Sequence, residues 1–136
     1  MALKKKGRHY YGDSRADIRP ELERYSQDNK YPIGRLDELS CPECGHERSH
    51  LILDEEAGAA VQCCVKCEHE VPLADSEEFL EEAELQQAEC PCGNGAFEMA
   101  VGFAFYKDST DVRWVYIGCR CPECGLTACY GDWKTP

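Results

Sequence analysis

Eleven cysteines in a chain of 136 residues, most of them in closely spaced pairs, constrain this fold more than any other feature. This length allows one ordinary domain or two very small units, and neither small unit could bury enough apolar surface to be stable unaided. Cysteines separated by one or two residues pair poorly with distant cysteines, whereas a tight turn can direct both sulfurs at one metal ion. The pairs therefore predict a small, metal-stabilised α+β fold.

The first set of cysteines is Cys41-Pro-Glu-Cys44 followed, after 19 residues, by Cys64-Val-Lys-Cys67. This spacing matches two Cys-x2-Cys pairs about 15–20 residues apart, the pattern that holds one zinc ion. We therefore predict Cys41, Cys44, Cys64 and Cys67 as the ligands of a first zinc ion.

The second set begins with Cys90-Pro-Cys92, one residue tighter than the usual pair, and closes 28 residues later with Cys121-Pro-Glu-Cys124. A glycine follows each of these pairs and permits the turn in which backbone N–H groups point at sulfur. We predict Cys90, Cys92, Cys121 and Cys124 as the ligands of a second zinc ion.

Each cysteine set encloses a predicted β-hairpin. In the first, apolar residues at 51–53 and 59–62 flank an acidic turn at 54–58. In the second, apolar residues alternate over 97–105 and again over 112–116, which predicts two long antiparallel strands. The apolar face of this second hairpin is wider than a lone ribbon can cover, so it must pack on the helices, the other ribbon or another chain.

Other residues leave the ligand sets open to alternatives. Cys63 could replace its neighbour Cys64, and Cys119 could compete with Cys121, whereas Cys129 is surplus. Three histidines near the first set are further possible ligands, although four better-spaced thiolates are available: His46, His50 and His69.

The chain divides into four predicted segments. Residues 1–35 form a basic arm and a short helix, 36–74 a first zinc ribbon, 75–89 a linker helix, and 90–136 a second zinc ribbon with a long β-hairpin. The two ribbons repeat one plan of cysteine pair, hairpin and cysteine pair.

Two helices are predicted from apolar spacing and capping residues. Ile18, Leu22 and Tyr25 recur on one face, which predicts a helix of about three turns that ends near Asn29. Asp75 is a candidate N-cap for the second, acidic helix between the two ribbons.

The net charge of −11 is unevenly distributed. Residues 1–30 hold eight Lys/Arg against five Asp/Glu, whereas residues 31–136 hold seven against twenty-one. Broad nucleic-acid binding by the acidic body is not expected, and a basic protein is the better electrostatic match. Nucleic acid could bind only through the N-terminal arm, where Lys4–Lys6 and Arg8 precede two tyrosines.

The compartment follows from the start of the chain and its thiols. Met1-Ala2-Leu3 runs directly into three lysines, with no apolar stretch of a secretory signal behind them. No apolar run approaches the length of a membrane span. We therefore expect a soluble, cytoplasmic protein with reduced cysteines.

The two cysteine sets make the chain resemble tandem zinc-ribbon proteins over residues 41–67 and 90–125. Cys121-Pro-Glu-Cys124-Gly125 also resembles the knuckle of rubredoxin, which implies a single redox iron as the alternative to zinc. Tetrahedral zinc and iron share this donor set, so the coordination type does not separate them.

Two narrower resemblances imply particular functions. The stretch 112–134 looks like that of small cysteine-rich bacterial proteins, some beside toxin genes, which implies an immunity-type role against a basic toxin. The acidic turn Asp54-Glu55-Glu56 is similar to that of transcript-cleavage zinc ribbons, which present carboxylates to the catalytic magnesium of a polymerase. In those proteins the neighbouring face is basic, whereas here Glu43 and Glu68 stand nearby.

Catalysis is not expected from these residues. A catalytic zinc needs an open coordination position, whereas both sets offer four sulfurs, and the sequence has no His-Glu zinc motif or phosphate-binding glycine loop. We expect a non-enzymatic protein-interaction module of unknown oligomeric state. Four aromatic residues either form its contact surface or pack between the ribbons: Trp114, Tyr116, Tyr130 and Trp133.

Overall fold

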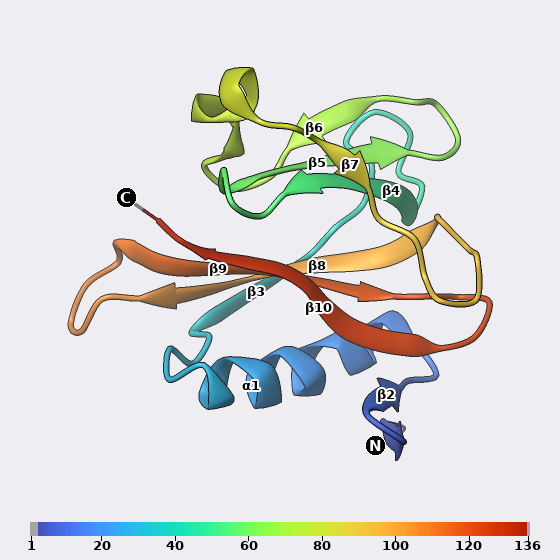
Figure 1. The fold of residues 1–136 in the computed structure, drawn as a ribbon, viewed down its shortest axis with the longest axis horizontal. Helices are drawn as coiled ribbons and strands as arrows, with labels where there is room; N and C mark the ends of the chain where they lie inside the picture. Colours follow the sequence, from blue (N-terminus) through green and yellow to red (C-terminus); the bar gives the residue numbers. More distant parts are fainter. Residues whose placement is uncertain (1–2, 136) are drawn as a thin grey trace.

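The computed structural model describes residues 3–135, which form a ten-stranded antiparallel sheet and one α-helix (Figure 1). The helix is α1 (Ile18–Asp28), and three short 3-10 turns are η1 (Arg15–Asp17), η2 (Ser76–Glu78) and η3 (Leu80–Glu82). The strands are β1 (Lys4–Lys6), β2 (His9–Tyr11), β3 (Arg35–Glu38), β4 (Arg48–Asp54), β5 (Ala59–Cys64), β6 (Glu70–Pro72), β7 (Gln86–Gln87), β8 (Phe97–Phe105), β9 (Val112–Arg120) and β10 (Leu126–Lys134).

The strands follow one order across the sheet, β1-β2-β10-β9-β8-β4-β5-β6, while β3 pairs with β8 and β7 pairs with β4. The two predicted hairpins are confirmed as β4–β5 and β8–β9. Arg48 and Ser49 of β4 lie opposite Glu98 and Phe97 of β8. Both cysteine sets therefore belong to one sheet, and the division into separate units stays a prediction.

Strand β8 contributes to two apolar cores, one on each face. Its odd-numbered side chains pack with the first hairpin, and its even-numbered ones pack with α1. In Figure 1, β4 and β5 lie above the layer of β8, β9 and β10, and α1 lies below it. The larger core joins Leu51, Ala60 and Leu73 to Phe97, Met99, Val101, Phe103, Val115, Ile117 and Trp133. The wide apolar face of the second hairpin is thus covered within the chain.

Helix α1 confirms the first predicted helix. Ile18 and Leu22 are completely buried, and the helix ends before Lys30, which adopts a left-handed φ of 71°. Small residues on the facing strands let the helix approach closely, because a Cβ at Gly118 would lie 2.5 Å from Ile18 Cγ2 and 2.9 Å from Leu22 Cδ1.

The helix predicted over residues 75–89 does not form, and the turns η2 and η3 and strand β7 occupy this segment instead. Asp75 accepts a hydrogen bond from Trp133 Nε1 at 3.2 Å rather than capping a helix. Ser76 Oγ accepts the N–H of Ala60 at 2.8 Å, which fixes the segment to β5. The segment has seven acidic residues and no Lys or Arg, so helical pairs such as Glu77 and Glu81 would repel.

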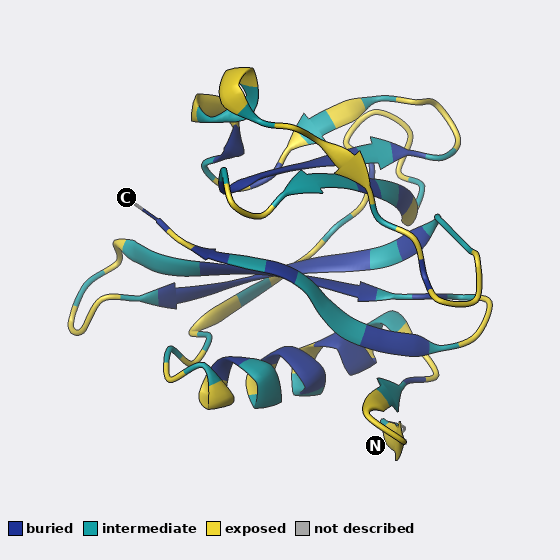
Figure 2. Ribbon diagram, viewed as in Figure 1, coloured by how far each residue is buried: buried dark blue, intermediate teal, exposed yellow. Residues whose placement is uncertain are grey.

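Six strands of the sheet were not predicted from the sequence: β1, β2, β3, β6, β7 and β10. Strand β10 pairs with β9, but a register shift between Cys129 and Gly131 breaks the apolar alternation that would have revealed it. The basic arm forms the hairpin β1–β2, which pairs with β10 through Tyr11 and Tyr10. Figure 2 shows that this hairpin and the segment of η2 and η3 are largely exposed, whereas the layer of β8 and β9 is mostly buried.

Among the described residues, no helix has the length and apolar composition needed to cross a membrane.

The contact between Gly118 and α1 gives a test of this packing. We expect Gly118→Ala to lower the free energy of unfolding by about 1–3 kcal/mol, because the added methyl group overlaps Ile18 and Leu22. In an Ile18→Leu background, which lacks the Cγ2 methyl, the same change should cost less. Chemical denaturation of the four proteins in this double-mutant cycle measures the difference. Strictly additive effects would contradict the packing described here.

Candidate metal centres

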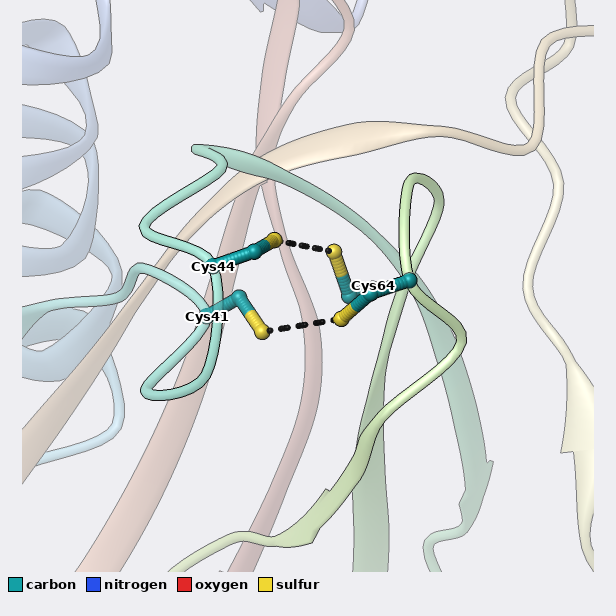
Figure 3. Close-up of side chains that lie close together, drawn as sticks. Cys41, Cys44 and Cys64 are labelled. Carbon is teal, nitrogen blue, oxygen red and sulfur yellow. Dashed lines mark hydrogen bonds between the residues drawn. The ribbon is translucent and has the colours of Figure 1, made fainter.

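The first four predicted ligands lie together between the strand ends of the first hairpin. Cys41 and Cys44 lie in the loop between β3 and β4, and Cys64 and Cys67 lie at the end of β5. Their Sγ atoms all lie within 4.8 Å of one another, with 3.5 Å between Cys41 and Cys67 and 3.5 Å between Cys44 and Cys64. Figure 3 shows the side chains of Cys41, Cys44 and Cys64 pointing toward a common centre.

The other four predicted ligands form a second cluster. Cys90 and Cys92 precede β8, and Cys121 and Cys124 lie in the turn between β9 and β10. The sulfurs of Cys90 and Cys124 are 3.5 Å apart, and those of Cys92 and Cys121 are 3.6 Å apart. In each cluster two cysteines are buried and two are exposed, so one side of each centre faces solvent.

The spacing of the sulfurs fits a tetrahedral ion. Zinc–sulfur bonds of about 2.3 Å place the sulfurs of a tetrahedron about 3.8 Å apart. The observed separations of 3.5 and 3.6 Å are slightly shorter than this and far longer than a disulfide bond. Each set could therefore hold one metal ion with four sulfur ligands, and such an ion would have no open coordination position.

Three of the four cysteine pairs use the same backbone turn, closed by two hydrogen bonds at the first cysteine. The N–H of Gly45 donates to the carbonyl of Cys41 at 2.8 Å, and the N–H of Cys41 donates to the backbone carbonyl of His46 at 2.9 Å. Cys64 and Cys121 repeat this pattern with residues at the same offsets. In every turn the residue after the second cysteine has a positive φ. This residue is Glu68 after Cys67 and a glycine after each of the other three pairs.

The tighter pair Cys90-Pro-Cys92 closes a similar turn with one residue fewer. The carbonyl of Cys90 accepts a hydrogen bond from the N–H of Gly93 at 2.7 Å. The N–H of Cys90 donates to the backbone carbonyl of Asn94 at 2.8 Å. The Asn94 side chain then donates from Nδ2 to Cys121 Sγ at 3.3 Å. The short spacing is thus compatible with a similar knuckle geometry, and Asn94 adds a donor to sulfur from the side chain.

Hydrogen bonding prepares thiols of both sets for metal binding. The N–H groups of Cys67 and Lys66 lower the pKa of Cys64 to about 6. At the second set, burial would raise the pKa of Cys121, but the Asn94 side chain and nearby backbone N–H groups lower it to about 6. Burial and the neighbouring sulfurs raise the pKa of Cys90 to about 12. Full ionisation of a set therefore requires a cation that displaces the remaining protons.

A buried hydroxyl beside the second set supports its fit to a metal ion. Tyr130 Oη is buried and has no hydrogen-bond partner among the described residues. Burial raises the pKa of Tyr130, and the nearby Cys119 and Cys90 add to this shift. An ionised Cys90 sulfur, as in a metal-bound set, would offer this hydroxyl the acceptor that it lacks.

The alternative ligands lie outside both clusters. Cys63 Sγ contacts the carbonyl of Glu68 at 3.8 Å, and Cys119 is completely buried in the larger core. Cys129 Sγ lies 3.3 Å from the carbonyl of Gly131. His46 and His69 contribute backbone carbonyls to the turns, and His50 Nδ1 lies 2.8 Å from the carbonyl of Gly95. Histidine therefore joins neither sulfur cluster in residues 3–135.

The acidic turn of the first hairpin has internal partners. Asp54 accepts hydrogen bonds from the N–H groups of Glu84, Ala57 and Glu56, which lower the pKa of Asp54. Glu55 Oε2 accepts the N–H of Asp132 at 2.8 Å. Two of the three carboxylates that resemble a magnesium-binding turn are thus engaged within the fold.

The four aromatic residues considered as a contact surface lie mainly inside the molecule. Tyr116 is completely buried and Trp133 is 6% exposed. Trp114 stacks on Tyr31 with ring centroids 5.0 Å apart, and Tyr130 packs on a phenylalanine of β8. Packing between elements of the fold thus accounts for most of these rings, while Trp133 and Tyr130 also line surface hollows.

Comparisons with known proteins found no match to this chain among protein-family models, curated proteins or solved structures. What the two cysteine sets can bind must therefore be inferred from their geometry.

The Asn94 side chain gives a test of the second centre. We expect Asn94→Asp to weaken metal binding there about 10- to 100-fold, because it removes the N–H donor to Cys121 and adds a negative charge. The aspartate keeps an oxygen for the N–H of Ala96, but it loses the N–H donor to the Ala96 carbonyl as well as the donor to Cys121. Competition with a chelator measures both sites at once, and the first site is the internal control. Release of both ions at unchanged chelator concentrations would contradict this role of Asn94.

Proposed function

We propose that this protein is a non-enzymatic binding protein in which two structural zinc ions hold the strand ends and an acidic surface binds a basic protein. The observation that supports it most strongly is the gathering of eight thiols into two complete four-sulfur sets. A complete set suits a structural ion, because a catalytic ion needs a position for water or substrate.

The distribution of charge supports a basic protein as the partner. Residues 36–89 hold sixteen Asp/Glu and only two Lys/Arg, whereas residues 90–136 hold five against four. A zinc ion bound by four thiolates leaves two further negative charges on each set. The acidity therefore belongs to the first hairpin and the segment after it, where a basic surface would be attracted.

An immunity-type role is the form of this function that the bacterial resemblance favours, with the acidic protein blocking a basic toxin. Such a protein needs a reducing compartment, and we place it in the cytoplasm, where thiols remain available to zinc. A polymerase-directed role is less well supported, because Asp54 and Glu55 already accept hydrogen bonds within the fold.

Metal content tests the proposal directly. We expect elemental analysis and native mass spectrometry of the purified protein to give two zinc ions per chain, one for each set. Replacing the exposed Cys44 and Cys67 with serine should remove one ion, because only two sulfurs remain in the first set. The matched control replaces Cys63 and Cys129, which lie outside both sets, and should retain two ions. Iron would instead support the rubredoxin-like alternative, and a metal-free, oxidised protein would refute both.

A second candidate function is contact with RNA through the N-terminal hairpin. The observation in its favour is that β1 presents Lys4, Lys5 and Lys6 as exposed residues beside two partly exposed tyrosines of β2. Basic side chains and aromatic rings together suit a single-stranded nucleic acid.

Replacing all three of these lysines with glutamine should abolish any salt-sensitive RNA binding, because it removes the exposed positive charge of β1. Fluorescence anisotropy with a labelled oligonucleotide measures it. Lys107→Gln, in the distant turn between β8 and β9, is the control. Equal binding by both variants would exclude the hairpin as the RNA site.

A further inference from the structure

We propose that a hollow beside the β4–β5 turn is the site where a lysine or arginine side chain of a basic partner binds. This inference deepens the proposed function and rests on it for the nature of the partner. The hollow has a volume of about 560 Å³ and lies between the β4–β5 turn, the segment of η2 and the end of β10. Its lining combines aromatic rings with carboxylates: Phe79, Tyr106 and Trp133 with Glu56 and Asp75.

The aromatic part of the lining is fixed in place by the fold. Trp133 is 6% exposed, and its indole N–H donates to Asp75 Oδ1 at 3.2 Å. The turn residue Gly58 lies against the same indole, since a Cβ there would be 3.2 Å from Trp133 Cδ1. Tyr106, at the other side, is 38% exposed, so part of its ring is available to a ligand. The hollow therefore needs little rearrangement to receive a side chain.

The carboxylates of the hollow have no cationic partner of their own. Glu56 and Asp75 take part in none of the ion pairs between described residues. An aromatic hollow without charge would suit an apolar ligand, but carboxylates at its edge favour a cation that lies over the rings. The chain already contains such a contact, because the Arg113 guanidinium lies 5.3 Å from the Tyr106 ring centroid. Arg113 itself is not among the residues that line the hollow.

A second hollow extends the acidic surface across the same turn. It has a volume of about 410 Å³, shares Glu56 with the first hollow and is also lined by Asp54, Glu55 and Glu84. Asp54 and Glu55 each accept a hydrogen bond from a backbone N–H group, the kind of donor that suits a carboxylate. A basic segment of the partner with one lysine or arginine side chain in the aromatic hollow would therefore place its neighbouring basic residues over this acidic hollow.

One residue of the hollow opposes a cation. Lys134 lines the rim, is exposed, and forms no ion pair among the described residues. Its removal should tighten the binding of a basic ligand, whereas removal of a carboxylate or a ring should weaken it. This opposite sign separates the hollow from a general effect of the acidic surface.

The test uses the zinc-loaded full chain and an acetylated, amidated nona-arginine peptide, with the affinity measured by titration calorimetry at physiological ionic strength. We expect Glu56→Gln and Tyr106→Ala each to weaken binding about three- to tenfold. Each has a matched control outside the hollow. Glu81→Gln removes the same charge from η3, and Leu85→Ala truncates a side chain that is also 38% exposed. Both controls should remain within about twofold of the original protein, and Lys134→Gln should tighten binding by about twofold.

The outcomes separate the hollow from the wider proposal. If Glu56→Gln and Glu81→Gln weaken binding equally while Tyr106→Ala has no effect, the hollow is overturned but an acidic binding surface stands. If the original protein does not bind the peptide at all, both the hollow and the basic partner are overturned. The zinc content, measured separately, is unaffected by either result. Should Tyr106→Ala fail to fold, Phe79→Ala removes another ring of the same hollow.

Discussion

Four sulfur atoms within 4.8 Å of one another are an unstable arrangement unless a cation lies among them. Thiolates at this distance repel, and neutral thiols give up hydration for weak hydrogen bonds. The backbone nevertheless brings four such groups together at two places, each time through turns closed by two hydrogen bonds at the first cysteine. The first cluster joins the β3–β4 connection to the end of β5, and the second joins the entrance of β8 to the β9–β10 turn. The ends of most strands in the sheet therefore depend on these two clusters.

Between the clusters, β8 lets a short chain form two cores. One face of this strand supports the first hairpin and the other face supports α1, so the strand is covered on both sides. The face toward α1 has small residues, Ala100, Gly102 and Ala104, and the opposite face has large ones. This asymmetry places the helix close to the sheet while the first hairpin packs over bulky side chains. The arrangement also brings the β4–β5 turn to the end of β10, where the aromatic hollow lies.

The sequence predicted the parts of the fold that depend on local spacing. Both sulfur clusters, α1 and the two hairpins follow from cysteine intervals, a 3.6-residue period and strict alternation, all of which are visible within short windows. Strand β10 was missed because the register shift near Cys129 hides its alternation. The segment 75–89 was predicted wrongly because long-range hydrogen bonds to Asp75 and Ser76 outweigh its helical pattern. Neither the hollow nor the pairing of β4 with β8 has a local signal, since both join residues far apart in the chain.

The two outermost strands of the sheet have a consequence for its behaviour at high concentration. An unpaired strand edge is a template on which another chain can add its own strand. At one edge, β1 consists of three exposed lysines, so two such edges would repel each other. At the other edge, β6 is three residues long and ends with Pro72, which has no N–H to donate. Both ends of the main strand order therefore disfavour the addition of a strand from another chain.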